Sequence, residues 1–317
     1  MSLGRSMDVR AALELEAQES PDAQREFRVL RDRGVEALRA GDLRGALDLF
    51  DRAAERARAS GDTDLADLAH CNRAAIAIEL GDGSGVLAEM RAILLRSRSA
   101  QCCMVAATNA ARIHDLAKDY KKGLFYARLA RDHAEAGGDA SQLASVRNLG
   151  ANLLLAESHV EEAAREYEAA LELMPEDDPV WRARALGNLG YCRVLQGRLR
   201  EAFVLLRQSI DPLRRLEARL YLVSPLTDLA FAHLEAGHPG PARNAAEEAL
   251  ALARELADDA GIKNALYLLG EAAGQLGDLQ LARSTFLELQ RSYYPDKPFV
   301  CDFLLSVDVR KIVNLRA

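Results

Sequence analysis

Two short stretches of the sequence combine residue types that could do chemistry. His233 and His238, with Glu235 between them, offer imidazole and carboxylate groups to a metal ion such as zinc. The two histidines are five positions apart, so they do not stack on one face of a helix, and no cysteine follows at zinc spacing. Adjacent Cys102 and Cys103 offer thiols, but neighbours on a helix point to different sides. The spacing favours a solvated helix end for the histidines, and core and groove positions for the two thiols.

A third stretch, Gly81-Asp82-Gly83-Ser84-Gly85, has the composition of a loop that binds phosphate or calcium. The chain contains no GxxxxGK[ST] phosphate loop, however, and no GxGxxG, GxSxG or HExxH motif. We therefore interpret the glycines as a turn between helices. We expect no catalytic residues, no metal and no other cofactor, although distant segments could still assemble a site that no motif reveals.

Helix-forming residues dominate the elements that must position any site. The 317 residues include 56 Ala and 51 Leu, against 1 Trp, 8 Tyr and 8 Phe. Strands need runs of Val, Ile, Thr and aromatic residues bounded by turns, and such runs are almost absent. The composition predicts an all-α protein.

Charge, apolar stretches and cysteine usage narrow the possible partners and cell compartment of the protein. The net charge is −7 with both signs interspersed, so the chain as a whole lacks the basic footprint of a nucleic-acid binder. The N-terminus has no apolar signal region, and no apolar stretch approaches the roughly 18 residues of a membrane span. The five cysteines are irregularly spaced, which is typical of reduced thiols. We expect a cytoplasmic protein that binds neither nucleic acid directly nor a membrane.

One pattern recurs seven times at intervals of 37 to 40 residues. A small residue is followed seven positions later by Gly and twelve positions later by a second small residue, with a larger residue four further on. The second copy has Val86 and Ile93 in place of small residues, and Lys118 and Ser158 replace the turn glycine in the third and fourth copies. The first small residues of the copies are Gly34, Ala74, Ala111, Ala151, Gly190, Ala230 and Gly270.

This pattern resembles the tetratricopeptide repeat, and the resemblance covers roughly residues 21–294. The long interval is similar to that of kinesin light chains, spindle adaptors and bacterial peptide receptors. The resemblance implies an α-α superhelix of about seven helical hairpins, with the first helices lining a concave groove. We expect an extension or cap over residues 1–19, the solenoid over 20–294 and a capping segment with a final helix over 295–317. A strand over 306–315 is the alternative for the last part.

The resemblance also implies that asparagines in the groove hold the backbone of an extended peptide. A carboxamide can both donate to a peptide carbonyl and accept from a peptide N–H. The alternative is that these side chains bond to neighbouring helices or face water. The candidates are Asn72, Asn109 and Asn188, with Asn148 if the fourth repeat slips by one position.

Charged and aromatic side chains surround these asparagines. The far end of the groove is acidic, with Asp228, Glu235 and Glu271. Its N-terminal and middle part is basic, although 35 of the 41 basic residues are Arg and composition alone could place them there; the candidates are Arg28, Arg31, Arg112, Arg147 and Arg184. Tyr191, Phe231 and Tyr267 are candidate anchors, with packing under the next repeat as the alternative for the first two. A bipolar peptide is the matching ligand.

The sequence thus predicts a non-catalytic scaffold or adaptor that binds an extended peptide segment of a protein partner. One alternative is a signalling or transcription regulator that responds to a ligand or peptide and lacks an effector domain of its own. Another is an assembly module that forms a homo-dimer or larger homo-oligomer.

Overall fold

Within the part of the chain that the structure describes, seven successive pairs of helices follow the seven predicted repeats. The computed structural model describes residues 23–37, 42–79, 85–174, 178–310 and 313–316. The predicted extension over 1–19 and most of the glycine cluster at 81–85 lie outside these residues. The described chain forms two compact units, the first ending at Val146 and the second beginning at Arg147.

The first unit contains three helix pairs and the start of a fourth. Residues 23–37 form a helix that pairs with the next one along the chain. The others are α2 (Leu43–Ser60), α3 (Thr63–Glu79), α4 (Val86–Arg96), α5 (Ala100–Leu116) and α6 (Tyr120–Gly137), with α7 (Ala140–Ala156) running across the unit boundary.

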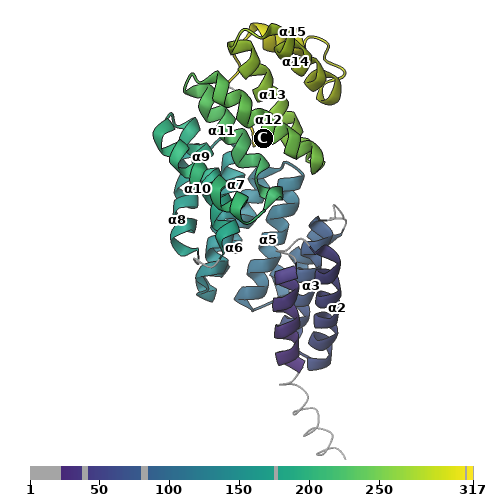
Figure 1. The fold of residues 1–317 in the computed structure, drawn as a ribbon. Helices are drawn as coiled ribbons and strands as arrows, with labels where there is room; N and C mark the ends of the chain where they lie inside the picture. The colour runs from purple at the N-terminus through teal and green to yellow at the C-terminus, as the bar shows by residue number, and fades with distance from the viewer. Residues whose placement is uncertain (1–22, 38–41, 80–84, 175–177, 311–312, 317) are drawn as a thin grey trace, which may run out of the picture. The chain divides into compact units, whose positions relative to one another are not determined.

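The second unit continues the same alternation of first and second helices (Figure 1). Its helices are α8 (Val160–Leu173), α9 (Pro179–Leu195), α10 (Leu199–Arg215), α11 (Val223–Glu235), α12 (Pro239–Glu255), α13 (Asp259–Gln275), α14 (Leu279–Tyr293) and α15 (Val300–Ser306), with a 3-10 turn at Arg219–Tyr221. No strand forms in the described parts of the chain, so the all-α prediction is confirmed and the alternative strand over 306–315 is wrong for the residues seen there.

Local sequence explains where these helices begin. An aspartate stands directly before many of them, and its carboxylate accepts the backbone N–H three residues later, which satisfies one of the free donors of the first turn. These capping residues are Asp42, Asp119, Asp178, Asp258 and Asp278. No described helix is both long and apolar enough to cross a membrane.

The small residues of the repeat lie where two helices of a pair approach closely. A Cβ on Gly34 would lie 2.5 Å from the ring of Phe50, and one on Gly270 would lie 2.3 Å from the ring of Phe286. Both rings are buried. The predicted pairing of a small residue with a larger one sixteen positions later is therefore confirmed at these two crossings.

The described turns between the helices of a pair, from Lys118 onward, have one residue with a left-handed backbone. Gly197 and Gly277 have φ angles of 71° and 78°, and Lys118 and Ser158 occupy the same turn position with φ angles of 55° and 63°. The structure thus confirms the register that assigned these two residues to the glycine position, although side chains make this conformation costly.

Replacing Gly277 with alanine should lower the free energy of unfolding by about 1 kcal/mol or more, because the left-handed backbone is retained while the Cβ is added. Urea denaturation followed by circular dichroism measures this change. Gly274→Ala is the matched control: this glycine lies within α13 and its new Cβ would be 4.0 Å from that of Ala282. Alanine should stabilise that position by about 0.5 to 1 kcal/mol. A loss at both positions would contradict the backbone explanation.

Candidate functional site

The first helices of the second unit bring three predicted groove residues together. Tyr191 on α9 is buried, and its ring centroid lies 6.2 Å from that of Phe231 on α11. Asp228, also on α11, has a side chain only 1% exposed. A buried carboxylate needs a charged partner or a proton. Its partner comes from outside the helix pairs.

That partner is Arg316, which belongs to a stretch of chain beyond α15. We call residues 307–310 and 313–316 the tail segment. Arg316 Nη2 lies 2.5 Å from Asp228 Oδ2, and the Arg316 guanidinium lies 4.7 Å from the centroid of the Tyr191 ring. The arginine side chain is 18% exposed, so the ion pair and the cation–π contact form largely away from water.

The residues just before Arg316 bind neighbouring first helices. The backbone N–H of Leu315 donates to the Tyr191 hydroxyl at 2.9 Å, and the Leu315 carbonyl accepts from Asn264 Nδ2 on α13 at 3.0 Å. Asn314 Nδ2 donates to the carbonyl of Leu155, at the end of α7, at 3.0 Å. Three consecutive residues therefore contact α7, α9, α11 and α13.

The earlier half of the tail segment lies at the acidic end of the groove. Arg310 Nη1 donates to the carbonyl of Leu234 at 3.1 Å and lies 3.6 Å from Glu235 Oε1. Asp308 accepts from the same guanidinium. The acidic residues predicted to attract a basic ligand segment thus face two arginines of the chain itself.

Burial and charge shift the ionisation of this site. Burial raises the pKa of Asp228 to about 6, although Arg316 acts in the opposite direction. Burial likewise raises the pKa of Glu271 to about 7, against the attraction of Arg310. The pKa of Tyr191 is raised to about 12 by burial, so its hydroxyl keeps its proton near neutral pH.

Two of the predicted asparagines bond to neighbouring first helices. Asn109 Nδ2 donates to the Cys71 carbonyl on α3 at 2.7 Å, and Asn188 Nδ2 donates to Asn152 Oδ1 on α7 at 3.2 Å. These contacts agree with the alternative interpretation of the ladder. Asn72 is buried, and its Nδ2 has no hydrogen-bond partner within the described chain. Asn148 is half-buried on α7. A role for these side chains in holding a peptide stays a prediction.

Two of the predicted basic residues, Arg147 and Arg184, have partners within the second unit. Arg112 is half-buried on α5. Arg147 Nη1 lies 2.8 Å from Glu166 Oε2 on α8, the second helix of its own pair. The Arg184 guanidinium covers the ring of Tyr221 at 4.5 Å from its centroid. Arg147 therefore forms an ion pair within the protein, and Arg184 stacks on an aromatic ring within the protein.

Tyr267 on α13 lies beside the tail segment. Together with Val309 and Leu315 it lines a pocket of about 410 Å³ that also reaches α14 and α15. The Tyr267 hydroxyl is buried without a hydrogen-bond partner among the described residues, and Asp228 Oδ1 is in the same condition. Tail binding thus leaves two polar atoms unsatisfied.

The histidine pair and the cysteine pair do not form a metal site or a reactive site among the described residues. His233 packs on Phe203, with ring centroids 4.8 Å apart, so the predicted solvated helix end is correct only for the exposed His238. Cys102 and Cys103 are both buried as free thiols. Within the described ranges, no group of three His, Cys, Asp or Glu side chains could hold a metal ion.

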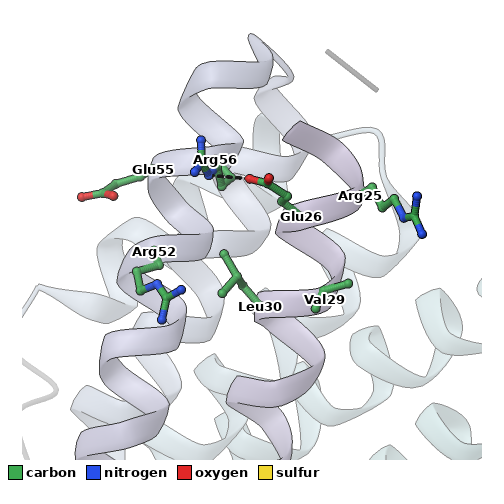
Figure 2. Close-up of a pocket in the computed structure, with 7 residues that line it drawn as sticks. All are labelled: Arg25, Glu26, Val29, Leu30, Arg52, Glu55 and Arg56. Carbon is green, nitrogen blue, oxygen red and sulfur yellow. Dashed lines mark ion pairs between the residues drawn. The ribbon is translucent and has the colours of Figure 1, made fainter. Parts of the chain in front are cut away.

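A separate depression in the first unit contains none of the predicted groove residues. It measures about 570 Å³ and lies between the helix over 23–37 and α2 (Figure 2). Arg56 Nε and Glu26 Oε2 form a 2.7 Å ion pair across it, and Figure 2 shows Arg25 pointing away from that pair. Mutually paired charges on two exposed helix faces do not single out a ligand.

Sequence reasoning missed Asn264, Arg310, Asn314 and Arg316. The available signal was the change of pattern after α14, where the repeat ends and valine, arginine and asparagine follow in an irregular order. We interpreted this change as a capping helix. The short α15 does pack on α14, but the eight described residues after it lie along first helices instead.

Comparisons with known proteins agree with this architecture. Residues 181–255 match the family model of the tetratricopeptide repeat. No curated protein matches the chain significantly.

Several solved structures share the fold. One is a Rap protein complexed with competence and sporulation factor, at 15% identity and a TM-score of 0.61, with 84% of this chain and 74% of that chain covered. BtubC from P. vanneervenii is 19% identical with a TM-score of 0.53, and the match covers 70% of this chain and 93% of that one. A tetratricopeptide repeat protein from Parabacteroides merdae is 14% identical with a TM-score of 0.52, covering 89% and 98%. At such identities the likeness extends to the fold alone.

Proposed function

Because the chain is a tetratricopeptide repeat protein, we propose that it is a non-catalytic adaptor that binds an extended segment of a protein partner along α7, α9, α11 and α13. One observation carries this proposal: these first helices already bind a stretch of chain from outside the helix pairs, the tail segment. Tyr191 and Asn264 hold the backbone N–H and carbonyl of Leu315, which every residue except proline offers. A segment from another protein can make the same two bonds.

The chemistry of the face supports binding over catalysis. Asp228 is buried in an ion pair, and the Tyr191 hydroxyl both retains its proton and accepts a backbone N–H. The thiol that interacts with both groups, Cys192, is buried, and burial raises its pKa to about 12, so it keeps its proton near neutral pH and is a poor nucleophile. One structural relative, a Rap protein, is seen in complex with competence and sporulation factor. A ligand-responsive regulator and a homo-oligomeric module remain the alternatives, and no contact of the described residues favours either.

A decapeptide display library, selected on the purified chain, tests this proposal. In an Arg316→Ala background, where the tail segment no longer pairs with Asp228, selected peptides should bind the Asp228→Asn variant at least about tenfold more weakly, since their own ion pair with Asp228 is lost; tenfold corresponds to about 1.4 kcal/mol. Glu248→Gln is the matched control, because this carboxylate pairs with Arg214 on the outer helices α12 and α10 and is well exposed. Equal loss in both variants, or no peptide whose binding depends on Asp228, would overturn the proposal.

A further inference from the structure

The tail segment binds through contacts that a separate peptide could reproduce. Leu315 is held by the side chains of Tyr191 and Asn264, and Asn314 is held by the carbonyl of Leu155 and the Ser158 hydroxyl, the latter at 3.2 Å. None of these bonds belongs to a helix ladder, and the residues they join are 51 to 159 positions apart. The tail segment therefore occupies the face as a ligand does.

The side chains of the tail segment define what this face recognises. Asn314 fits the carbonyl groups at the end of α7, Leu315 is almost fully buried, and Arg316 fits between Asp228 and the Tyr191 ring. Each of the three positions selects a different chemistry: a carboxamide, an aliphatic group and a guanidinium. Lysine would not reproduce the last contact equally well, because a planar guanidinium can stack on the ring and bond to a carboxylate together.

The match between the tail segment and the face is incomplete. The Tyr267 hydroxyl and Asp228 Oδ1 are buried without partners, and a pocket of about 410 Å³ remains beside Val309 and Leu315. Buried polar atoms without partners weaken binding, and unfilled apolar space forgoes packing. A segment that donates to these two oxygens or fills the pocket would bind more tightly than the tail segment does.

On the basis of the proposed function, we propose that the tail segment is an internal competitor of the partner, and that the partner presents an asparagine, an aliphatic residue and an arginine in succession. The partner displaces the tail segment because it donates hydrogen bonds to the Tyr267 hydroxyl and Asp228 Oδ1, which the tail segment leaves unpaired. Because the tail segment is tethered, its effective concentration at the face is of millimolar order, so a partner of the same intrinsic affinity binds the intact chain only weakly.

The test uses a fluorescent, amidated synthetic peptide with the sequence of residues 307–316. It is titrated against the intact chain and against the Asn314→Ala/Arg316→Ala variant, whose own tail segment has lost its anchors. The variant should bind the peptide at least tenfold more tightly than the intact chain. A peptide carrying Arg316→Ala should bind the variant no more tightly than the unaltered peptide binds the intact chain. Arg254→Ala, which removes an exposed arginine paired with Glu288, is the control and should bind as the intact chain does. Equal affinity of the variant and the intact chain would overturn the proposal.

A second measurement covers the case in which the double variant fails to fold. Hydrogen exchange of the tail segment is followed in the intact chain with and without excess peptide. Exchange at Leu315 should accelerate as the peptide takes its place, and unchanged exchange would show that the tail segment is a fixed part of the fold. If library peptides depend on Asp228 but bind intact and tail-weakened chains equally, only the competition fails. If neither chain binds any peptide, the proposed function fails as well.

Discussion

Replacing Gly270 with valine is expected to lower the free energy of unfolding by about 3 kcal/mol, because the new side chain meets a ring that has little room to move. The added Cβ alone would lie 2.3, 2.6 and 2.7 Å from three carbons of Phe286. That ring is 2% exposed and lies on α14, which is held against α13 along its length. The change is measured by urea denaturation followed by circular dichroism.

A second substitution separates this clash from a general effect of valine in a helix. In the Gly270→Val background, Phe286→Leu removes the edge of the ring and should restore part of the lost stability, although the same change alone is destabilising. Such a reversal of sign requires direct contact between the two side chains. If the two losses simply add, the close approach of α13 and α14 is not what makes glycine necessary at position 270.

The pairing of Gly270 with Phe286 shows which contacts the repeated sequence pattern can predict. The two residues are sixteen positions apart in one hairpin, and the same spacing relates Gly34 to Phe50. Contacts within a hairpin recur in every copy, so the repeated letters are sufficient to predict them. The left-handed backbone at Lys118 could be predicted for the same reason, since most other copies place glycine there.

Contacts that occur once in the chain could not be predicted in this way. Tyr191 and Leu315 are 124 positions apart, and the tail segment has no period that would reveal its path. The asparagines illustrate a related limit. Their repeat position was predictable, but whether Asn109 bonds to the Cys71 carbonyl or to a ligand depends on which groups the packed helices bring within reach.

The charge of the groove could be predicted from the sequence, but the group that neutralises it could not. The acidic side chains of the later repeats indicated a basic ligand segment, and the arginines that face Asp228 and Glu235 have that charge. What the pattern could not indicate is that these arginines, Arg310 and Arg316, belong to the chain itself. Complementary charge specifies the chemistry of an occupant and leaves its source open.

The ionisation of Asp228 gives the second large expected effect. Burial raises its pKa to about 6, and Arg316 only partly offsets that rise. In the unfolded chain an aspartate titrates near a pKa of about 3.9. Between these values the folded protein binds the proton that the unfolded chain has released, so this group favours folding at low pH. Its contribution is fully present below about pH 4 and is lost as the pH rises through about 6.

The free energy of unfolding of the wild-type chain, relative to that of Asp228→Asn, is therefore expected to fall by about 2 kcal/mol between pH 4 and pH 7. Subtracting the variant cancels groups that titrate in both chains, including Glu271, whose pKa is raised to about 7. Urea denaturation at a series of pH values measures the difference. Repeating the series in an Arg316→Gln background should move the step to higher pH, because the guanidinium is the group that lowers the pKa of Asp228. A difference that stays constant across the series would mean that Asp228 is solvated in the folded protein and that the tail segment does not bury it.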